Sequence, residues 1–283
     1  MNRLIKLADD AAYKPHFIIA SLLSLGFVIL GSSFTLLGLF VDVPDYLSLA
    51  IFDLSIGFGA ISILCFLYVR AIERRPIYSM GFEKDKWLKK YGRGFGLGIG
   101  LFTLAVIVGY LTGAFEVSLS ISSANGFAII AILFGFLIQG ATEEIIYRGW
   151  LLPIVSARYT PVFGVILSSL LFAFLHGGNP GITILPIINL ILFGLFAAVY
   201  ALKEESLWGI CGFHSAWNWV QGSVFGIKVS GTTVPGGSIL TSSPTQGMDL
   251  ISGGAFGIEG SIVCTLIFLI PTIILVLKLK KKQ

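Results

Sequence analysis

The sequence predicts an all-α, polytopic membrane protein with about eight transmembrane helices and both termini in the cytoplasm. The first observation is composition: of 283 residues, 55% are hydrophobic and 12% are charged. A soluble domain carries about 25% charged residues. So much apolar surface cannot be buried in one globule of this length, so the chain is expected to be solvated by lipid, as a single membrane domain over 1–283.

The second observation is a series of apolar runs, each near the length of about 20 residues that a membrane-spanning helix needs. The first run is longer than the hydrophobic part of a cleaved signal peptide, and it is therefore expected to remain as a helix. The fourth run is expected to continue as helix toward Pro153. The predicted spans are 17–41, 48–69, 94–114, 127–147, 161–177, 183–201, 207–222 and 259–278.

The third observation is the distribution of the positive charges, which sum with the acids to a net charge of +4. With eight spans, one side of the membrane receives both termini and the connections after the even-numbered spans. Lys228 is the lone Lys or Arg on the other side, where the connections carry Asp42, Asp45 and Glu116. The positive-inside rule therefore places both termini in the cytoplasm. The positive residues on that side are Arg3, Lys6, Lys14, Arg70, Arg74, Arg75, Lys84, Lys86, Lys89, Lys90, Arg93, Arg158, Lys203, Lys278, Lys280, Lys281 and Lys282.

Two segments carry structural signals of their own. Residues 223–257 are rich in Gly, Ser and Thr and are predicted to form an exterior loop. Residues 94–100 contain two glycine pairs at a spacing of four, Gly94 with Gly98 and Gly96 with Gly100. This spacing predicts close helix packing in lipid, because small residues let two backbones approach each other.

Ionisable side chains at membrane depth are costly, and one cluster of them lies at 139–149. Glu144 and Arg148 stand four residues apart on a helix, so they are expected to pair on one face. Glu143 is rotated by about 100° from Glu144 and is free to point elsewhere. One acid is thus neutralised by its own helix while the other stays available for chemistry.

Three more polar residues lie in the fifth and seventh spans. His176 ends the fifth span, and His214 and Asn218 share one face of the seventh because they are four residues apart. If the fourth helix runs unbroken to a turn near Ala157, Glu143 is roughly 20 Å from that turn, at a depth similar to these residues. If the helix ended at Arg148, Glu143 and His176 could not meet. Taken together, these groups favour a reaction site over isolated helix-to-helix hydrogen bonds. The alternative use of the same groups is a proton or ion relay.

The ordered motifs Glu143-Glu144-x-x-x-Arg148, Phe172-x-x-x-His176 and His214-x-x-x-Asn218 resemble those of the CAAX-protease and bacteriocin-processing family, also called the abortive-infection family. This family includes type II CAAX prenyl endopeptidases. The resemblance covers roughly 88–220, which is the expected family catalytic core. Gly253 to Glu259 also resembles a feature of some bacterial members.

The resemblance implies an intramembrane glutamate endopeptidase. Glu143 would act as the general base that activates water, His176 would help to bind and polarise that water, and His214 with Asn218 would stabilise the oxyanion. Glu144 and Arg148 would hold the site in shape. No metal ligand and no cofactor is predicted, because a base and an oxyanion hole suffice for hydrolysis, although the three residues Glu143, His176 and His214 leave zinc open.

The expected partners are the lipid bilayer and a peptide or protein substrate, prenylated or not, and no nucleic acid. The expected location is the bacterial plasma membrane, with the cleaved bond near the C-terminus of a lipidated or membrane-associated peptide. The alternative is a non-catalytic protein on the same scaffold, either a bacteriocin immunity factor or a proton-coupled transporter. Proton flux that depends on Glu143 would favour that alternative.

Overall fold

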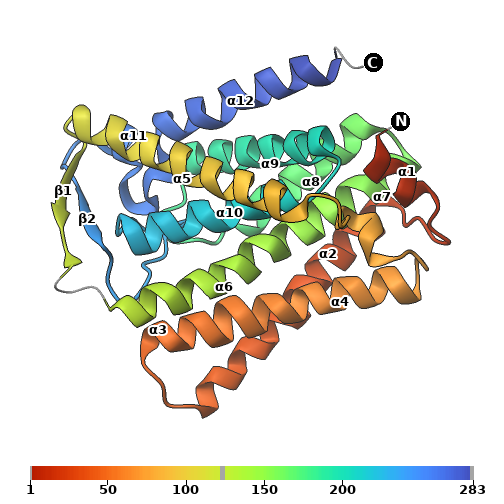
Figure 1. The fold of residues 1–283 in the computed structure, drawn as a ribbon, viewed down its shortest axis with the longest axis horizontal. Helices are drawn as coiled ribbons and strands as arrows, with labels where there is room; N and C mark the ends of the chain where they lie inside the picture. Colours follow the sequence, from red (N-terminus) through yellow and green to blue (C-terminus); the bar gives the residue numbers. More distant parts are fainter. Residues whose placement is uncertain (1, 122–124, 281–283) are drawn as a thin grey trace.

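The protein is described by a computed structural model that covers residues 2–121 and 125–280 (Figure 1). The chain is mostly helical, which confirms the predicted all-α class. The α-helices are α1 (Arg3–Asp9), α2 (Phe17–Ser32), α3 (Asp45–Ser48), α4 (Phe58–Ala71), α5 (Trp87–Leu111), α6 (Gly126–Glu144), α7 (Leu152–Arg158), α8 (Pro161–Leu175), α9 (Ile184–Glu204), α10 (Trp208–Trp219), α11 (Asp249–Ser252) and α12 (Ile262–Lys280).

Several of these helices continue into wider or tighter turns. Three segments are π-helical: η2 (Leu49–Gly57) leads into α4, η5 (Ile145–Leu151) joins α6 to α7, and η6 (Val220–Val224) extends α10. The 3₁₀ turns are η1 (Ser33–Phe40), η3 (Ile77–Met80), η7 (Gly254–Phe256) and η8 (Ile258–Gly260).

Six helices within the described residues are long and apolar enough to cross a membrane, which makes this an integral membrane protein. They are Phe17–Phe40, Asp45–Ala71, Trp87–Leu111, Gly126–Arg158, Ile184–Glu204 and Ile262–Lys280. The other two predicted spans form the shorter helices α8 and α10. Both are shorter than an independent span needs. All of Gly209–Asn218 in α10 is buried, whereas α8 exposes apolar side chains such as Val162 and Phe174.

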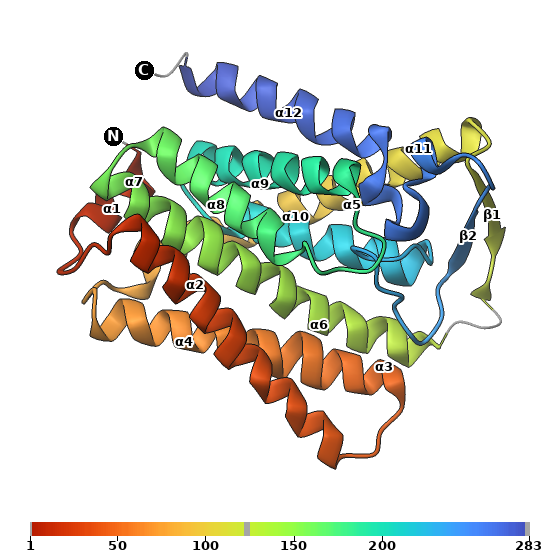
Figure 2. The same ribbon diagram turned by 180° about the vertical axis from the view of Figure 1, so that it is seen from behind.

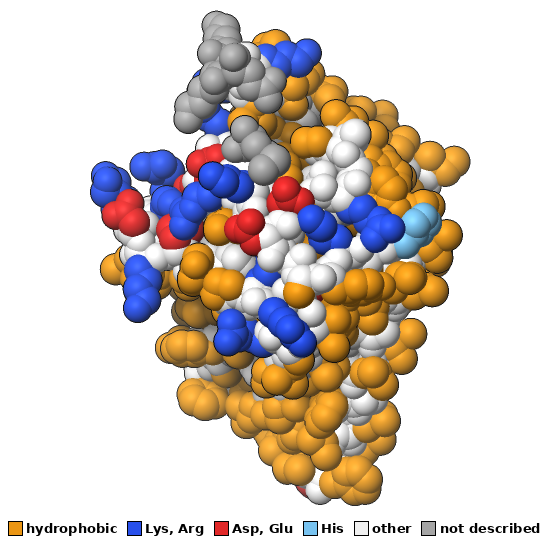
Figure 3. Space-filling model, turned by 90° about the vertical axis from the view of Figure 1, so that its right-hand side faces the viewer, with side chains coloured by type: hydrophobic (Ala, Val, Ile, Leu, Met, Phe, Trp, Pro, Cys, Tyr) orange, Lys and Arg blue, Asp and Glu red, His pale blue; other side chains and the backbone are white. Residues whose placement is uncertain are grey.

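The ends of the molecule differ in charge. Both described ends of the chain and the turn after α7 lie at one end (Figure 1), and Lys and Arg side chains gather on that face (Figure 3). The opposite end carries a two-stranded antiparallel sheet of β1 (Phe115–Leu119) and β2 (Leu240–Pro244), in which Val117 pairs with Ser242. This arrangement agrees with the charge asymmetry of the sequence; Lys281 and Lys282 lie outside the described residues.

The strand pair adds structure to the predicted loop at 223–257, which also contains the short helix α11. The apolar runs of the sequence do not indicate these strands, because each is five residues long and finds its partner more than 100 positions away. The strands join the segment after α5 to the segment before α12. The predicted loop is therefore an ordered cap over one end of the helices.

The packing of α5 against α10 explains one of the two glycine pairs. A Cβ atom on Gly94 would lie 1.7 Å from the Gly209 carbonyl oxygen, and one on Gly98 would lie 2.5 Å from the Phe213 carbonyl oxygen. No heavy atom lies within 4 Å of such an atom on Gly96 or Gly100. The predicted close helix contact is thus confirmed for Gly94 and Gly98, while the other pair faces away from α10.

Helix α6 continues without a break through η5 and α7 to Arg158. This meets the condition for Glu143 to lie deep within the bundle. On the far side, α2 crosses α4 and α6 diagonally, and α12 runs beside α9 (Figure 2). Helices α6, α8, α9 and α10 form the interior that holds the polar residues.

Candidate active site

A cavity of about 360 Å³ lies between these helices, and four of the residues singled out from the sequence line it: Glu143, His176, His214 and Asn218. Glu144 and Arg148 do not line the cavity and are fully buried behind it. The i,i+4 geometry anticipated this division between the two acids. The structure thus brings the residues of three distant motifs to one place.

Glu143 stands on the last α-helical turn of α6, directly before the π-helical segment η5. Its Oε1 accepts a hydrogen bond of 2.8 Å from the Gln139 side chain. Its Oε2 has no hydrogen-bond partner among the described residues and lies 3.5 Å from His214 Nε2. One oxygen of this carboxylate is therefore hydrogen-bonded, whereas the other is buried beside His214 without a hydrogen-bond partner among the described residues.

Glu144 connects two elements. Its Oε1 accepts from Arg148 Nη1 at 3.2 Å and lies 2.9 Å from His214 Nδ1. The predicted Glu144–Arg148 pair is therefore present. The second terminal nitrogen of Arg148 donates to the Gly194 carbonyl of α9 at 3.2 Å. Because a buried charge is costly unless it is paired and hydrogen-bonded, these contacts make Glu144 and Arg148 a mutually dependent pair.

The partners of the two histidines assign the proton on each ring. His214 Nδ1 faces the Glu144 carboxylate, which only accepts, so Nδ1 carries a hydrogen and Nε2 points toward Glu143. His176 Nδ1 lies 2.8 Å from the Phe172 carbonyl oxygen, which also only accepts. In its neutral form His176 therefore presents Nε2 as an acceptor.

Local sequence places His176 at the cavity. Thr160 caps the start of α8 by accepting from the Phe163 N–H, and Pro161 occupies its first turn. Gly177 and Gly178 follow His176 directly and end the helix. His176 thus stands at the terminus of α8, where its ring is half-buried and reaches the cavity wall.

Asn218 lies one turn after His214 on α10 and donates to Gln139 Oε1 at 2.8 Å. Gln139 donates in turn to Glu143. The Gln139 amide therefore links the Glu143 carboxylate on α6 to the Asn218 amide on α10. The side-chain nitrogen of Asn218 carries two hydrogens, and only one is used in this bond. The second hydrogen is available to a ligand in the cavity.

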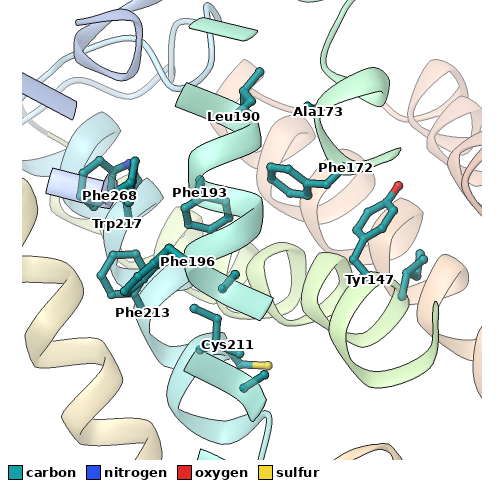
Figure 4. Packing of buried hydrophobic residues seen from close by; sticks show 14 of the residues in the cluster. Tyr147, Phe172, Ala173, Leu190, Phe193, Phe196, Cys211, Phe213, Trp217 and Phe268 are labelled. Atoms are coloured by element: carbon teal, nitrogen blue, oxygen red, sulfur yellow. The ribbon is translucent and has the colours of Figure 1, made fainter. Parts of the chain in front are cut away.

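An aromatic wall surrounds these polar groups (Figure 4). Phe193 of α9 lies between Phe172 and the Phe196–Phe213 pair, and its ring centroid is 4.8 Å from that of His214. The Arg148 guanidinium lies 4.7 Å from the centre of the Phe172 ring. The wall excludes water behind the site, which strengthens the electrostatic interactions inside it.

Sequence reasoning assigned no role to three polar residues of the cavity lining: Gln139, Asp53 and Glu259. Gln139 could have been found, since it is one helical turn before Glu143. Asp53 could have been found as an acid within the apolar run 48–69. Glu259 gave only a loose resemblance, yet its carboxylate accepts from the Ser230 backbone at 2.6 Å, from Gln221 at 3.1 Å and from Trp217 at 3.3 Å.

The side chains that could bind a metal ion are few at this site. Among residues 2–121 and 125–280, no group of three or more His, Cys, Asp and Glu side chains is arranged to hold a metal ion. Cys65, Cys211 and Cys264 are all buried and unpaired. The side chains at the cavity do not fit a resident zinc ion in this arrangement.

Fold and cavity together define an integral membrane protein of packed helices with a buried carboxylate, histidine and amide site. Residues 125–220, about a third of the chain, match the family model described as type II CAAX prenyl endopeptidase Rce1-like. This match confirms the resemblance seen in the motifs, and it contains all six predicted site residues. It indicates a protease of the CAAX type in general terms. Searches of curated proteins and of solved structures returned no match.

Proposed function

We propose that this protein is an intramembrane endopeptidase that hydrolyses a peptide bond with water activated by Glu143. The observation that carries the proposal is Glu143 Oε2, which has no hydrogen-bond partner among the described residues and lies 3.5 Å from His214 Nε2, in a cavity that Asn218 also lines. A general base needs a free acceptor within hydrogen-bond reach of the water that it deprotonates. The match of residues 125–220 to an endopeptidase family supports the same reaction class.

In the proposed reaction, Glu143 Oε2 takes a proton from a water molecule, whose second hydrogen is oriented by the Nε2 acceptor of His176. The water oxygen bonds to the carbonyl carbon of the substrate, and the carbonyl oxygen becomes an oxyanion. The protonated Glu143 then gives its proton to the amide nitrogen as the C–N bond breaks. The products are a carboxylic acid and an amine, and no co-reactant other than water is consumed.

The oxyanion is stabilised by donors that are fixed before the reaction starts. In the proposal, the second amide hydrogen of Asn218 donates to it, and His214 donates from Nε2 in its doubly protonated form. Removal of one such donor costs about 10²- to 10³-fold in kcat in known hydrolases. Glu144 and Arg148 act through His214: Glu144 fixes the ring by its 2.9 Å contact, and Arg148 neutralises Glu144.

The proposed substrate is a lipidated or membrane-associated peptide cleaved near its C-terminus, and prenylated peptides belong to the first set to test. No cofactor is required in this mechanism. The proposed setting is a bacterial plasma membrane with eight membrane-embedded helices, the termini in the cytoplasm and residues 223–257 on the exterior side. Lys and Arg side chains gather at the end of the molecule that holds both described chain ends, which supports this orientation.

The test is a cleavage assay in liposomes with fluorogenic peptides, each with and without a farnesyl group. Wild type is expected to cleave at least one peptide, and Glu143→Gln to cleave none while it elutes as a folded protein in detergent. Glu116→Gln, which changes an exposed acid on β1, serves as the matched control. Cleavage retained in Glu143→Gln overturns the mechanism. Proton flux that requires Glu143, without cleavage of any peptide, would favour a transporter.

A further inference from the structure

The cavity has a buried base and an open mouth. Glu143, His214 and Asn218 at the base are all buried. Asp53 and Thr232, which line the same cavity, are exposed. A substrate segment that enters past Asp53 meets its charge before it reaches Glu143, so the charge at the mouth influences which segments can bind.

Asp53 is an unusual residue for its place in the chain. It lies within the apolar helix Asp45–Ala71, and its side chain makes no hydrogen bond or ion pair with any residue that the structure describes. A carboxylate in a membrane span is costly without a partner, and such residues mark functional sites. Asp53 also sits in the π-helical segment η2, a type of turn found frequently at functional sites.

Among the described residues, the Asp, Glu, Lys and Arg side chains that line the cavity are all acidic. Three carboxylates line it, at Asp53, Glu143 and Glu259, whereas no Lys or Arg of the described residues does so. Glu259 is occupied by its donors from Ser230, Gln221 and Trp217. Glu143 is used in the proposed chemistry. Asp53 is thus the carboxylate of the lining that has neither a partner nor a role in the reaction.

Helix packing gives the distance of Asp53 from the base. Leu54 packs directly against Gly135 of α6, eight residues before Glu143 on the same helix. At about 1.5 Å per residue, this places Asp53 roughly 12 Å from Glu143 along the helix axis. An extended peptide rises about 3.3 Å per residue, so this span corresponds to three or four residues.

We propose that Asp53 is a specificity-determining residue, which binds a Lys or Arg side chain of the substrate three or four residues from the bond that Glu143 hydrolyses. The position relative to the scissile bond rests on the proposed function, whereas the preference for a cation rests on the lining alone. An acidic side chain at the same position meets Asp53 and no compensating cation among the described lining residues, so it is disfavoured. The cavity thus selects a segment with a basic side chain at this position.

The test measures binding and cleavage separately in detergent. Labelled decapeptides of one apolar sequence carry a single Lys, Gln or Glu that is moved through each position. Binding is measured by fluorescence anisotropy, and cleavage by mass spectrometry. The protein variants are Asp53→Asn, Asp53→Lys and, as a matched control, Asp45→Asn. Asp45 is an exposed acid near the start of the same helix that does not line the cavity.

Wild type and Asp45→Asn are expected to bind the best Lys peptide about fivefold more tightly than its Glu counterpart, the upper value for a partly exposed ion pair. Asp53→Asn is expected to remove this ratio and Asp53→Lys to invert it. Equal binding of Lys and Glu peptides by wild type, or a ratio unchanged in both Asp53 variants, overturns the inference. Charge-dependent binding without cleavage would refute the proposed peptidase and leave the role of Asp53 standing.

Discussion

Gln139 and Asn218, which lie 79 positions apart in sequence, share a hydrogen bond of 2.8 Å that joins α6 to α10 beside Glu143. Through Gln139, the proposed base and the proposed oxyanion donor are held at a fixed separation. Gln139 is therefore a positioning residue, because it acts through two other side chains. Its removal should affect the reaction more than the binding of substrate.

Gln139→Met keeps the side-chain length and removes both hydrogen bonds. We expect kcat to fall by up to about 100-fold with little change in KM, because small misplacements of catalytic groups are costly. Steady-state kinetics with a cleaved peptide measure both constants. The control is Ser168→Ala, which removes a buried hydroxyl of α8 that donates to the Val165 carbonyl. An increase in KM at constant kcat would show that Gln139 contacts substrate instead.

The Glu144–Arg148 pair should behave as one unit. Arg148→Met leaves the fully buried Glu144 without its cation, and loss of one partner of a buried pair costs about 3–5 kcal/mol. The double variant Glu144→Gln/Arg148→Met should be more stable than Arg148→Met alone, because no charge remains unpaired. Thermal unfolding in detergent measures this. If the stability loss of the double variant equals the sum of the losses of Glu144→Gln and Arg148→Met, the two residues are not coupled.

The two glycine pairs of α5 provide an internally matched test. Gly94→Ala and Gly98→Ala place a methyl group against the backbone of α10 and should destabilise the fold by about 1–3 kcal/mol or more. Gly96→Ala and Gly100→Ala meet open space and should be neutral or stabilising by up to about 1 kcal/mol, since Ala is the better helix former. Equal effects of all four on the unfolding temperature would contradict the observed helix contact.

Glu259 holds the segment before α12 against α10 and η6. Glu259→Gln replaces one acceptor oxygen by an amide that faces donors, so the hydrogen bonds to Ser230 and Gln221 should weaken. We expect faster hydrogen exchange at 228–236 and no change in α5. Asp249→Asn, an exposed substitution in α11, is the control. Unchanged exchange at 228–236 would show that other contacts hold the cap.

Cysteine labelling can determine the orientation of the protein in the membrane. Cys65, Cys211 and Cys264 are buried, so a single new cysteine at an exposed position should dominate the signal. With an impermeant maleimide on intact cells, we expect Glu116→Cys to react and Lys280→Cys to react only after lysis. The reverse pattern would invert the proposed topology. Reaction of both in intact cells would contradict termini in the cytoplasm.

Local periodicity predicted much of this site because its main relations are short in sequence. The pair Glu144–Arg148 and the shared face of His214 and Asn218 follow from helical geometry alone. The continuation of α6 past Arg148 decided whether the motifs could meet, and the sequence left that conditional. The apolar character of the runs identified the long spans but could not distinguish them from the short helix α8 or from the buried helix α10.

Contacts between distant segments could not be predicted in the same way. Gln139 was visible as a polar residue, but its bond to Asn218 depends on how α6 packs against α10. The role of Glu259 depends on a loop that folds back onto Trp217 and Gln221. No periodic pattern encodes the β1–β2 pairing, because the two strands are far apart in the sequence and meet only when the helices between them have packed. These relations arise from tertiary packing, which a single sequence does not specify.

Helix α10 carries two of the proposed site residues, and every residue of Gly209–Asn218 is shielded from the bilayer by other helices. A helix that touches no acyl chains does not need to match the thickness of the hydrocarbon layer. Stretching or thinning of the bilayer acts on the outer helices, such as α2 and α12, whose exposed large hydrophobic side chains are aliphatic. The spacing of His214 and Asn218 should therefore be the same in short-chain and long-chain lipids.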